Sequence, residues 1–513
     1  MVTELPSELW LVISGYLSDE EIKPLAAVNR VFFNISLDIR YREITIGDMD
    51  SATVRLLKRL QDPATASRVH RLNIVGHVRS ERASNDFPSG VSAFRGRVAV
   101  AMQALQHSLL SPLPMAISHR PVGPVRISPE DATALLVTVL PLLHRLECFM
   151  IDFWHCPSGF YIHPVLSNSW PSFGSHLTTL FLTGHLSTLE TVIDTQPSLP
   201  NLLELIIQLT DPFLLTVDDN VATLNNYVVP FINSLAPTLR TFMVWSWASL
   251  DLSSVFVQLR QFPHLTKFRL RTAFNKSFVS DPSGLSRFIR AHSQTLEELQ
   301  LWVTCSGAML DTSVDQPLSR WLHDLANDTP SFPALKDLHI HPSRQVLGFD
   351  AFLSMVSKSD ILENLIIRDV YFNEEQIRSL LGVLAPDAPN VTLHSLRLNT
   401  TSFKGGLFEA MAEKLPELKS LSMHIGDLST EQETIEQMLQ GRKLAHWHLY
   451  NVGLWRSGGK VDEDSMRAVQ RCIPSVKSFW GMGHTNFELK EEPALRQRVR
   501  RSVEIENHNF ANI

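Results

Sequence analysis

Cysteine is scarce in this sequence: the 513 residues include only 4, scattered as Cys148, Cys156, Cys305 and Cys472 without any Cys-x-x-Cys pair. This usage excludes a disulfide-rich fold and indicates a reduced, intracellular protein. Long apolar runs are missing as well. The longest, such as residues 135–140, are far too short to cross a bilayer, so we expect no membrane partner.

A strong excess of charge of either sign is also missing. The formal net charge is −7, which gives no general attraction to nucleic acid or acidic membranes. No basic segment precedes the first apolar stretch, and Glu4 and Glu8 lie within it, so we expect no secretion and place the protein in the cytoplasm or nucleus. A hydrophobic content of 44% supplies ample material for a globular core.

Motifs of catalysis and metal binding are missing too. The sequence contains no G-x-S-x-G, no H-E-x-x-H and no G-x-G-x-x-G opening a helix. The pairs His339-x-His341 and His446-x-His448 have a spacing that zinc can use, but no further ligand joins either pair. We therefore expect no catalytic residue, no cofactor and no metal, and an unrecognised enzyme is the weakest of three hypotheses.

Residues 5–33 carry three short helical patterns. Leu9, Val12 and Ile13 recur at helical spacing, and Pro24 suggests that the second helix begins there, because proline is tolerated in a first helical turn. A segment of about 40 residues is normally too small to bury a core alone. Its apolar stripe is therefore expected to dock on something else.

This stretch resembles an F-box and aligns with the family pattern without a gap. The matching positions are Leu5, Pro6, Glu8, Leu9, Leu11, Ile13, Tyr16, Leu17, Glu20, Leu25, Ala26 and Val28. Phe32 stands where the family usually has Trp. Carried over residue by residue, the resemblance implies that the contacts with a Skp-type adaptor are Leu5, Pro6, Leu9, Ile13, Leu17, Leu25, Val28 and Phe32.

After residue 69 the chain repeats an L-x-x-L-x-L pattern. The copies that we identify begin at Val69, Leu177, Leu202, Leu239, Leu265, Leu296, Leu335, Leu362, Leu393, Leu418 and Leu444, with weaker ones at Leu143 and Val476. Each copy predicts a short strand, because its last two apolar positions are two residues apart and share a face. Helical patterns lie between the copies, for example at 286–291, 376–384, 407–415, 430–439 and 464–472.

From Leu177 onward the copies begin 25 to 39 residues apart. A strand and a helix that repeat at such a period are the signature of a leucine-rich-repeat solenoid. The array resembles the degenerate repeats that follow F-boxes in many fungal proteins. The predicted fold class is α/β, with parallel strands on a concave face and helices on a convex face. The expected domains are an F-box at 1–45, a connecting helix at 46–68, an irregular solenoid at 69–485 and a capping tail at 486–513. Residues 76–130, with a helix at 91–110, fit the repeat least well.

Strand residues that alternate with the leucines are expected to point out from the concave face. Those chosen as target-binding are Trp245, Arg269, Arg271, Trp302, His339, His341, Arg368 and Arg397. Exposed Trp and Arg are enriched at binding hot spots, and Arg engages carboxylates and phosphates bidentately, so the target is expected to be acidic or phosphorylated. The alternative is that loops or the C-terminal tail cover these side chains.

The resemblance implies a substrate receptor of an SCF-type, cullin–RING ubiquitin ligase. The F-box would bind the Skp-type adaptor, and through it a cullin, while the repeats hold an unidentified target protein. Catalysis would then be proximity supplied in trans, with no active-site residue on this chain. The second hypothesis is a non-catalytic interaction scaffold whose F-box acts outside a ligase.

Overall fold

A computed structural model describes residues 6–47, 50–75, 127–152, 161–209, 217–246, 250–303, 315–401, 405–426, 437, 439, 441–456, 463–480 and 486–488. The chain forms two compact units: unit 1 comprises Met1–Arg79 and Arg120–His292, and unit 2 comprises Ser80–His119 and Ser293–Ile513. The expected helix at 91–110, most of the one at 430–439 and nearly all of the capping tail lie outside the described residues.

Unit 1 begins with three helices, α1 (Ser7–Ser14), α2 (Asp19–Leu25) and α3 (Arg30–Arg42). Their boundaries follow from local capping. Ser18 forms a capping box with Glu21 at the start of α2, and the Asn29 side chain accepts a hydrogen bond from Phe32 N at 2.9 Å. The expectation that α2 begins at Pro24 is wrong, because the capping box starts the helix at Asp19 and leaves Pro24 in the last turn.

A small core holds these three helices together. Ile22 is 3% exposed and Phe32 is 2% exposed, and the Phe32 ring meets Trp10 edge to face at 5.3 Å between centroids. Edge-to-face pairs of this kind stabilise beyond the apolar area that they bury. The helix cluster is therefore organised around the Trp10–Phe32 pair.

The strands of unit 1 pair in parallel and in chain order. They are β1 (Glu43–Ile46), β2 (Arg71–Val75), β3 (Cys148–Asp152), β4 (Thr179–Gly184), β5 (Glu204–Leu209), β6 (Thr241–Ser246) and β7 (Lys267–Thr272). Residues alternate along each strand: in β4, Leu180 and Leu182 are buried whereas Thr179 and Phe181 are only partly covered. This alternation confirms the strand pattern predicted for residues 177–270.

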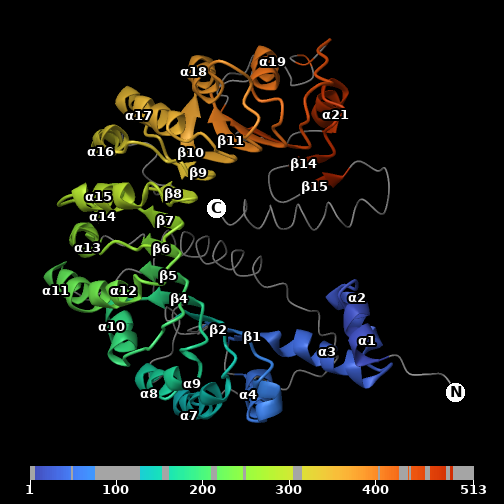
Figure 1. Cartoon of the computed structure of the whole chain (residues 1–513), viewed down its shortest axis with the longest axis vertical. Helices are drawn as coiled ribbons and strands as arrows, with labels where there is room; N and C mark the ends of the chain where they lie inside the picture. Colours follow the sequence, from blue (N-terminus) through green and yellow to red (C-terminus); the bar gives the residue numbers. More distant parts are fainter. Residues whose placement is uncertain are drawn as a thin grey trace, which may run out of the picture. The chain divides into compact units, whose positions relative to one another are not determined.

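The helices of unit 1 follow the strands one repeat at a time. They are α4 (Ser51–Leu60), α5 (Pro63–Ala66), α7 (Pro129–Val139), α8 (Ile162–Ser167), α9 (Trp170–Phe173), α10 (Leu186–Asp194), α11 (Val217–Thr223), α12 (Val229–Leu235), α13 (Ser253–Gln258), α14 (Phe274–Ser277) and α15 (Ser283–His292). Figure 1 shows α10, α12 and α13 along one face of strands β4–β7. In each unit we call the other face of the strands, to which the residues between the buried leucines point, the helix-distal face of that unit.

Phenylalanine fills the core between these strands and helices. The Phe288 ring on α15 lies 5.1 Å from Phe268 on β7 and 5.4 Å from Phe262, and Phe242 and Phe256 pack against it edge to face. Close packing of large rings leaves no room for slippage between repeats. The expected core of the repeat is thus present in unit 1.

Unit 2 continues the same strand–helix alternation. Its strands are β8 (Glu298–Trp302), β9 (Asp337–Ile340), β10 (Asn364–Phe372), β11 (Ser395–Thr400), β12 (Ser420–Ile425), β13 (Asn451–Arg456), β14 (Ser478–Trp480) and β15 (Asn486–Glu488), and all pair in parallel except β15, which is antiparallel to β14. Its helices are α16 (Asp315–Asp328), α17 (Val346–Ser357), α18 (Glu374–Leu384), α19 (Gly405–Lys414) and α21 (Glu463–Cys472). Both units therefore have the leucine-rich-repeat fold.

Two predicted strands were placed too early. The copies that begin at Leu143 and Leu444 end at Cys148 and Leu449, whereas the strand β3 only starts at Cys148 and β13 only starts at Asn451. In both places a second copy overlaps the first, and it begins at Leu146 or Leu449 and matches the buried strand residues. The true register puts Cys148 and Met150 on the helix-distal face of β3.

The strand β1 was not predicted at all. It follows α3 without a linker and pairs with β2 from Glu43↔Arg71 to Ile46↔Ile74, within a segment expected to belong to the F-box and the connecting helix. Its signal is Tyr41-x-x-Ile44-x-Ile46, the same pattern with Tyr in the first position. Among the described residues, no helix is long and apolar enough to cross a membrane.

Candidate interaction surfaces

The helix cluster α1–α3 exposes a large apolar surface. Seven large apolar side chains are 37–86% exposed there: Leu9, Leu11, Val12, Ile13, Tyr16, Val28 and Phe33. Leu9, Val12, Ile13 and Tyr16 recur at i, i+3, i+4 and i+7, so they share one face of α1 and its C-terminal extension. Clustered exposed apolar side chains mark interaction sites, whereas isolated ones are ordinary.

The structure places the expected adaptor contacts in three groups. Leu9, Ile13 and Val28 are exposed, as is Pro6, and Leu17 and Leu25 are partly buried. Phe32 is a correction: it lies in the core against Trp10, so it shapes the helix cluster and does not present a contact surface. Leu5 lies outside the described residues.

The predicted adaptor contacts omit two strongly exposed members of this surface. Tyr16 is 86% exposed and Val12 is 57% exposed, and both lie on the same face as Leu9. Their signal was the helical spacing itself, which extends from Leu9 to Tyr16.

Electrostatic contacts hold the helix cluster to the repeats within unit 1. Arg68, in the turn before β2, forms an ion pair with Asp38 of α3 and donates hydrogen bonds to the Asn34 carbonyl oxygen at 3.1 Å and its Oδ1 at 3.4 Å. The backbone N–H of His70 donates to the carbonyl of Arg42 at 2.9 Å. Together with the direct connection of α3 to β1, these contacts fix the orientation of α3 on the first repeat.

The helix-distal face of unit 1 contains a row of apolar side chains. Met150, Phe181, Ile206 and Met243 are register partners on β3, β4, β5 and β6, so they lie side by side across four strands. Met243 is 6% exposed, and the other three are partly buried. We call these four residues the apolar row.

The row continues into a basic strand. Its next register partner is Arg269, and all three residues that β7 places on the helix-distal face are cationic, namely Lys267, Arg269 and Arg271. The Arg271 guanidinium lies over the Trp245 ring at 5.4 Å, a cation–π contact that orients the charge. Arg271 is only 8% exposed and Trp245 is partly buried, which corrects the expectation that both point freely into solvent.

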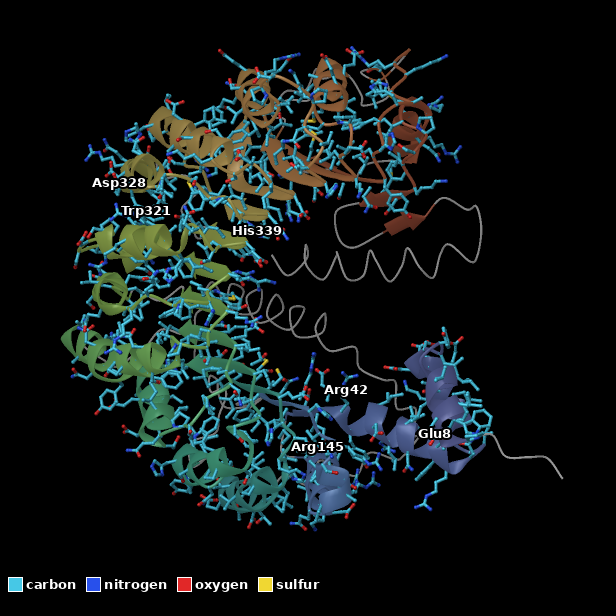
Figure 2. All side chains as sticks on the ribbon, in the orientation of Figure 1. Glu8, Arg42, Arg145, Trp321, Asp328 and His339 are labelled. Carbon is cyan, nitrogen blue, oxygen red and sulfur yellow. The ribbon has the colours of Figure 1, made fainter. Side chains whose placement is uncertain are left out.

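Unit 2 has its own Arg–Trp pair. The Arg368 guanidinium lies over the Trp302 ring at 4.7 Å. Arg368 is 7% exposed, and Trp302 is partly buried. Figure 2 shows His339 on the side of β9 away from α16, where Trp321 and Asp328 lie, and its Nδ1 contacts the Gln300 amide nitrogen at 2.8 Å.

His341 belongs to a buried network. It is 4% exposed, its Nδ1 lies 3.1 Å from the Arg368 carbonyl oxygen, and its Nε2 lies 3.9 Å from Asp315 Oδ1. Burial alone would raise the pKa of the Asp315 carboxyl, but the nearby His341 and hydrogen bonds from the Arg344 backbone and the Ser343 hydroxyl outweigh it and hold that pKa below its usual value. His341 therefore stabilises the turn after β9, and its selection as a target contact is corrected.

Ser343, His341 and Asp315 do not form a catalytic triad. The Ser343 hydroxyl donates its hydrogen bond to the Asp315 carboxylate at 2.8 Å and not to the His341 imidazole. A nucleophilic serine needs its base within hydrogen-bond reach. Among the described residues, moreover, no cluster of three or more His, Cys, Asp or Glu could hold a metal ion.

A second histidine lies beside the β10 bulge. The register of β10 against β11 shifts between Ile366 and Tyr371, and the Tyr371 hydroxyl contacts His424 Nδ1 at 2.5 Å. Burial, helped by the nearby Arg397 charge, lowers the pKa of His424. Neutral His424 can therefore accept a hydrogen bond from the Tyr371 hydroxyl. Arg397, which is partly buried, lies near this pair on the helix-distal face of unit 2.

The helix-distal face also carries carboxylates, which the sequence reading omitted. The first residue of each strand faces the same way as the third, so Glu204 on β5 belongs to the helix-distal face of unit 1 and Asp337 on β9 to that of unit 2. Glu204 accepts a hydrogen bond from the Thr179 hydroxyl at 3.3 Å. The face is therefore not uniformly basic, and its positive charge is concentrated on β7 in unit 1.

Comparison with known proteins finds no family profile and no curated protein that matches this sequence. Solved structures with some likeness include the Rad7–Elc1 complex of yeast, with 14% identity and a TM-score of 0.30 over 74% of this chain and 97% of that chain. An internalin of Listeria monocytogenes has 12% identity and a TM-score of 0.31 over 81% and 95% of the two chains. The TLR13–ssRNA13 complex has 13% identity and a TM-score of 0.29 over 67% and 50%.

TM-scores at this level carry no argument about function. The assignment of the leucine-rich-repeat fold rests instead on the parallel registers, the alternating burial and the helix between successive strands. Repeats of this architecture are interaction scaffolds, because the sheet presents a regular surface of alternate side chains. The candidate functional sites of this chain are therefore interaction surfaces.

Proposed function

We propose that this protein is the substrate-recognition subunit of an SCF-type, cullin–RING ubiquitin ligase. In this role α1–α3 bind a Skp-type adaptor, and through it a cullin, while the repeats hold a target protein. The observation that carries the proposal is the exposed apolar surface on α1–α3, joined directly to a repeat sheet. The sequence resemblance of residues 5–33 to an F-box supports the choice of adaptor.

The connection between α3 and β1 supports the same role. A ligase subunit must hold its target at a defined distance from the ubiquitin-charged enzyme, because proximity is its only catalytic contribution. A flexible linker would lower the effective concentration of the target at the enzyme. Here α3 passes into β1 without a linker, and Arg68 ties it to the next repeat.

The helix-distal face of each unit is a proposed target surface. Trp245 with Arg271 in unit 1, and Trp302 with Arg368 in unit 2, are Trp–Arg pairs of the types that dominate binding hot spots. Stacking on an aromatic ring keeps each guanidinium in place and reduces the entropy lost on binding. Arg269, His339 and Arg397 are partly buried on the same faces and complete the proposed set.

Substitution of Leu9 by Asp tests the adaptor surface. Leu9 is 46% exposed, so the Leu9→Asp variant should fold normally, yet it introduces a charge into the proposed apolar contact. We expect adaptor affinity, measured by calorimetry, to fall at least about thirtyfold, or ~2 kcal/mol. The matched control is Val279→Asp on a loop of unit 1, where Val279 is 70% exposed, and it should bind the adaptor like the wild type.

Two results would contradict the adaptor role. One is unchanged adaptor binding by Leu9→Asp. The other is no adaptor binding by the folded wild-type protein, which would leave the alternative of an interaction scaffold acting outside a ligase. A thermal unfolding scan of each variant separates loss of contact from loss of structure.

A further inference from the structure

We infer that the target-binding element recognised by unit 1 is an amphipathic helix whose apolar stripe ends in acidic residues. This inference rests on the proposed function, because it names the kind of partner that the helix-distal face of unit 1 would take. The surface consists of the apolar row (Met150, Phe181, Ile206, Met243) and the three cations of β7.

The spacing of the apolar row selects a helix as the partner. Adjacent parallel strands lie about 4.8 Å apart, so the four side chains of the row are spread over roughly 14 Å. One face of an α-helix presents a side chain about every 5.4 Å, so three turns span about 16 Å and match the row within about 2 Å. An extended segment presents same-face side chains about every 6.7 Å and would miss the fourth position by about 6 Å, more than one strand spacing.

The chemistry of the row suits such a helix. Met150 and Met243 form its two ends, and methionine is flexible and adapts to a partner whose spacing does not match perfectly. Phe181 and Ile206 form its centre and are only partly buried. Laying the apolar face of a helix into such a surface is a recurring mode of recognition.

Charge defines which end of the partner is acidic. Beyond Met243 the register continues to Arg269, flanked on the same strand by Lys267 and Arg271. The neighbouring helix-distal residues of β6 are Thr241, Met243 and Trp245, which include no carboxylate. Acidic residues in the turn after the apolar stripe would therefore meet the partly exposed Lys267 and Arg269, with the buried Arg271 adding positive charge behind them, and arginine pairs bidentately with a carboxylate.

Trp245 adds a second polar requirement to the same end. Its ring lies under the Arg271 guanidinium, and its buried indole N–H has no hydrogen-bond partner among the described residues. A buried donor without an acceptor costs free energy.

The test uses synthetic peptides and this 513-residue chain without adaptor. The first is an 18-residue helix-forming peptide with leucine at i, i+4, i+7 and i+11 and three glutamates in the following turn. The second carries three lysines in that turn, and the third has two central residues replaced by proline. Fluorescence anisotropy should show binding of the glutamate peptide and at least tenfold weaker binding of the other two.

Variants of the protein locate the peptide. Phe181→Asp should weaken the glutamate peptide at least tenfold, and the pair Lys267→Glu with Arg269→Glu should reverse the preference in favour of the lysine peptide. The reversal is a gain of binding, so it cannot arise from misfolding. The control Lys276→Glu, at an exposed position on α14, should leave both affinities unchanged.

Equal binding of the glutamate and lysine peptides, or binding that survives Phe181→Asp in a folded protein, would overturn the inference. So would a single-stranded oligonucleotide or a second copy of the chain that occupies the row and is displaced by the same variants. Failure of adaptor binding, by contrast, would contradict the ligase role without affecting the peptide results. The two proposals are therefore separately falsifiable.

Discussion

At the scale of single residues, His292 shows how a titratable group is built into the core. It is 2% exposed, its Nε2 accepts the Phe262 backbone N–H at 2.9 Å, and its Nδ1 lies 2.7 Å from the Phe288 carbonyl oxygen. These contacts require the neutral ring with its proton on Nδ1. Burial lowers the pKa of His292, although the hydrogen bond to Phe288 acts in the opposite direction.

This arrangement predicts a pH dependence of stability. A histidine whose pKa is lowered by folding binds protons more readily when unfolded, so its contribution is complete above the unfolded pKa of about 6.5 and is lost as the pH falls below it. His292→Gln retains an acceptor and a donor but does not titrate. We expect the difference in melting temperature between wild type and His292→Gln to move in favour of the variant as the pH falls from about 7.5 to about 5.5. A constant difference would show that His292 does not titrate on unfolding.

Residue positions in the sheet could be predicted from the sequence, whereas their environment could not. The last two apolar positions of each copy, i+3 and i+5, predict which residues point outward, and Trp245, Arg269 and Trp302 do lie on strands. Their stacking partners come from neighbouring repeats, and no local pattern specifies that Arg271 covers Trp245 or that Arg368 covers Trp302. Phe32 was misread for the same reason, since its burial depends on Trp10 of another helix.

At the scale of elements, the turn between β9 and α17 depends on a close approach. Ser343 has a φ of 68°, in the left-handed region, and its hydroxyl donates to Asp315 at 2.8 Å. A Cβ on Gly348 would lie 2.5 Å from the Ser343 Cβ and 2.8 Å from the Pro342 carbonyl oxygen. Glycine is therefore required where α17 begins.

Alanine scanning of two helical glycines tests this packing. Gly348→Ala should destabilise the protein by about 1–3 kcal/mol, the usual cost of overpacking. The matched change Gly382→Ala lies on α18, where a Cβ meets nothing within 4 Å, and should be neutral or stabilising by up to about 1 kcal/mol because alanine favours the helix. Chemical denaturation measures both. Equal effects of the two changes would contradict the role of Gly348.

Element predictions succeeded where a pattern was unambiguous. Strands β4–β12 follow single copies of the leucine pattern, and their registers agree with it. β3 and β13 follow two overlapping copies, so a local rule could not choose between them, and only the burial of Phe149 and Val452 decides the register. The strand β1 was not predicted because Tyr41 replaces the first leucine of the repeat pattern. The strand also lies next to the helix cluster that matched the F-box pattern.

At the scale of the whole molecule, two kinds of surface account for the proposed role. The exposed apolar side chains of α1–α3 suit a permanent protein partner, and the helix-distal faces, with their Arg–Trp pairs, suit a target that must be released. The former could be anticipated from residues 5–33 alone. For the helix-distal faces, the sequence predicted which residues lie on strands but not the distribution of charge, because that distribution depends on which strands are neighbours.

The central claim is that this chain joins a target to an adaptor–cullin complex through α1–α3. The most direct measurement is the mass of the assembly formed when this purified chain is mixed with a Skp-type adaptor and a cullin. The account predicts a 1:1:1 complex for the wild type and for Phe181→Asp, and an adaptor–cullin complex without this chain for the folded Leu9→Asp variant. A wild-type protein excluded from the adaptor–cullin complex, or a Leu9→Asp protein retained in it, would contradict the account.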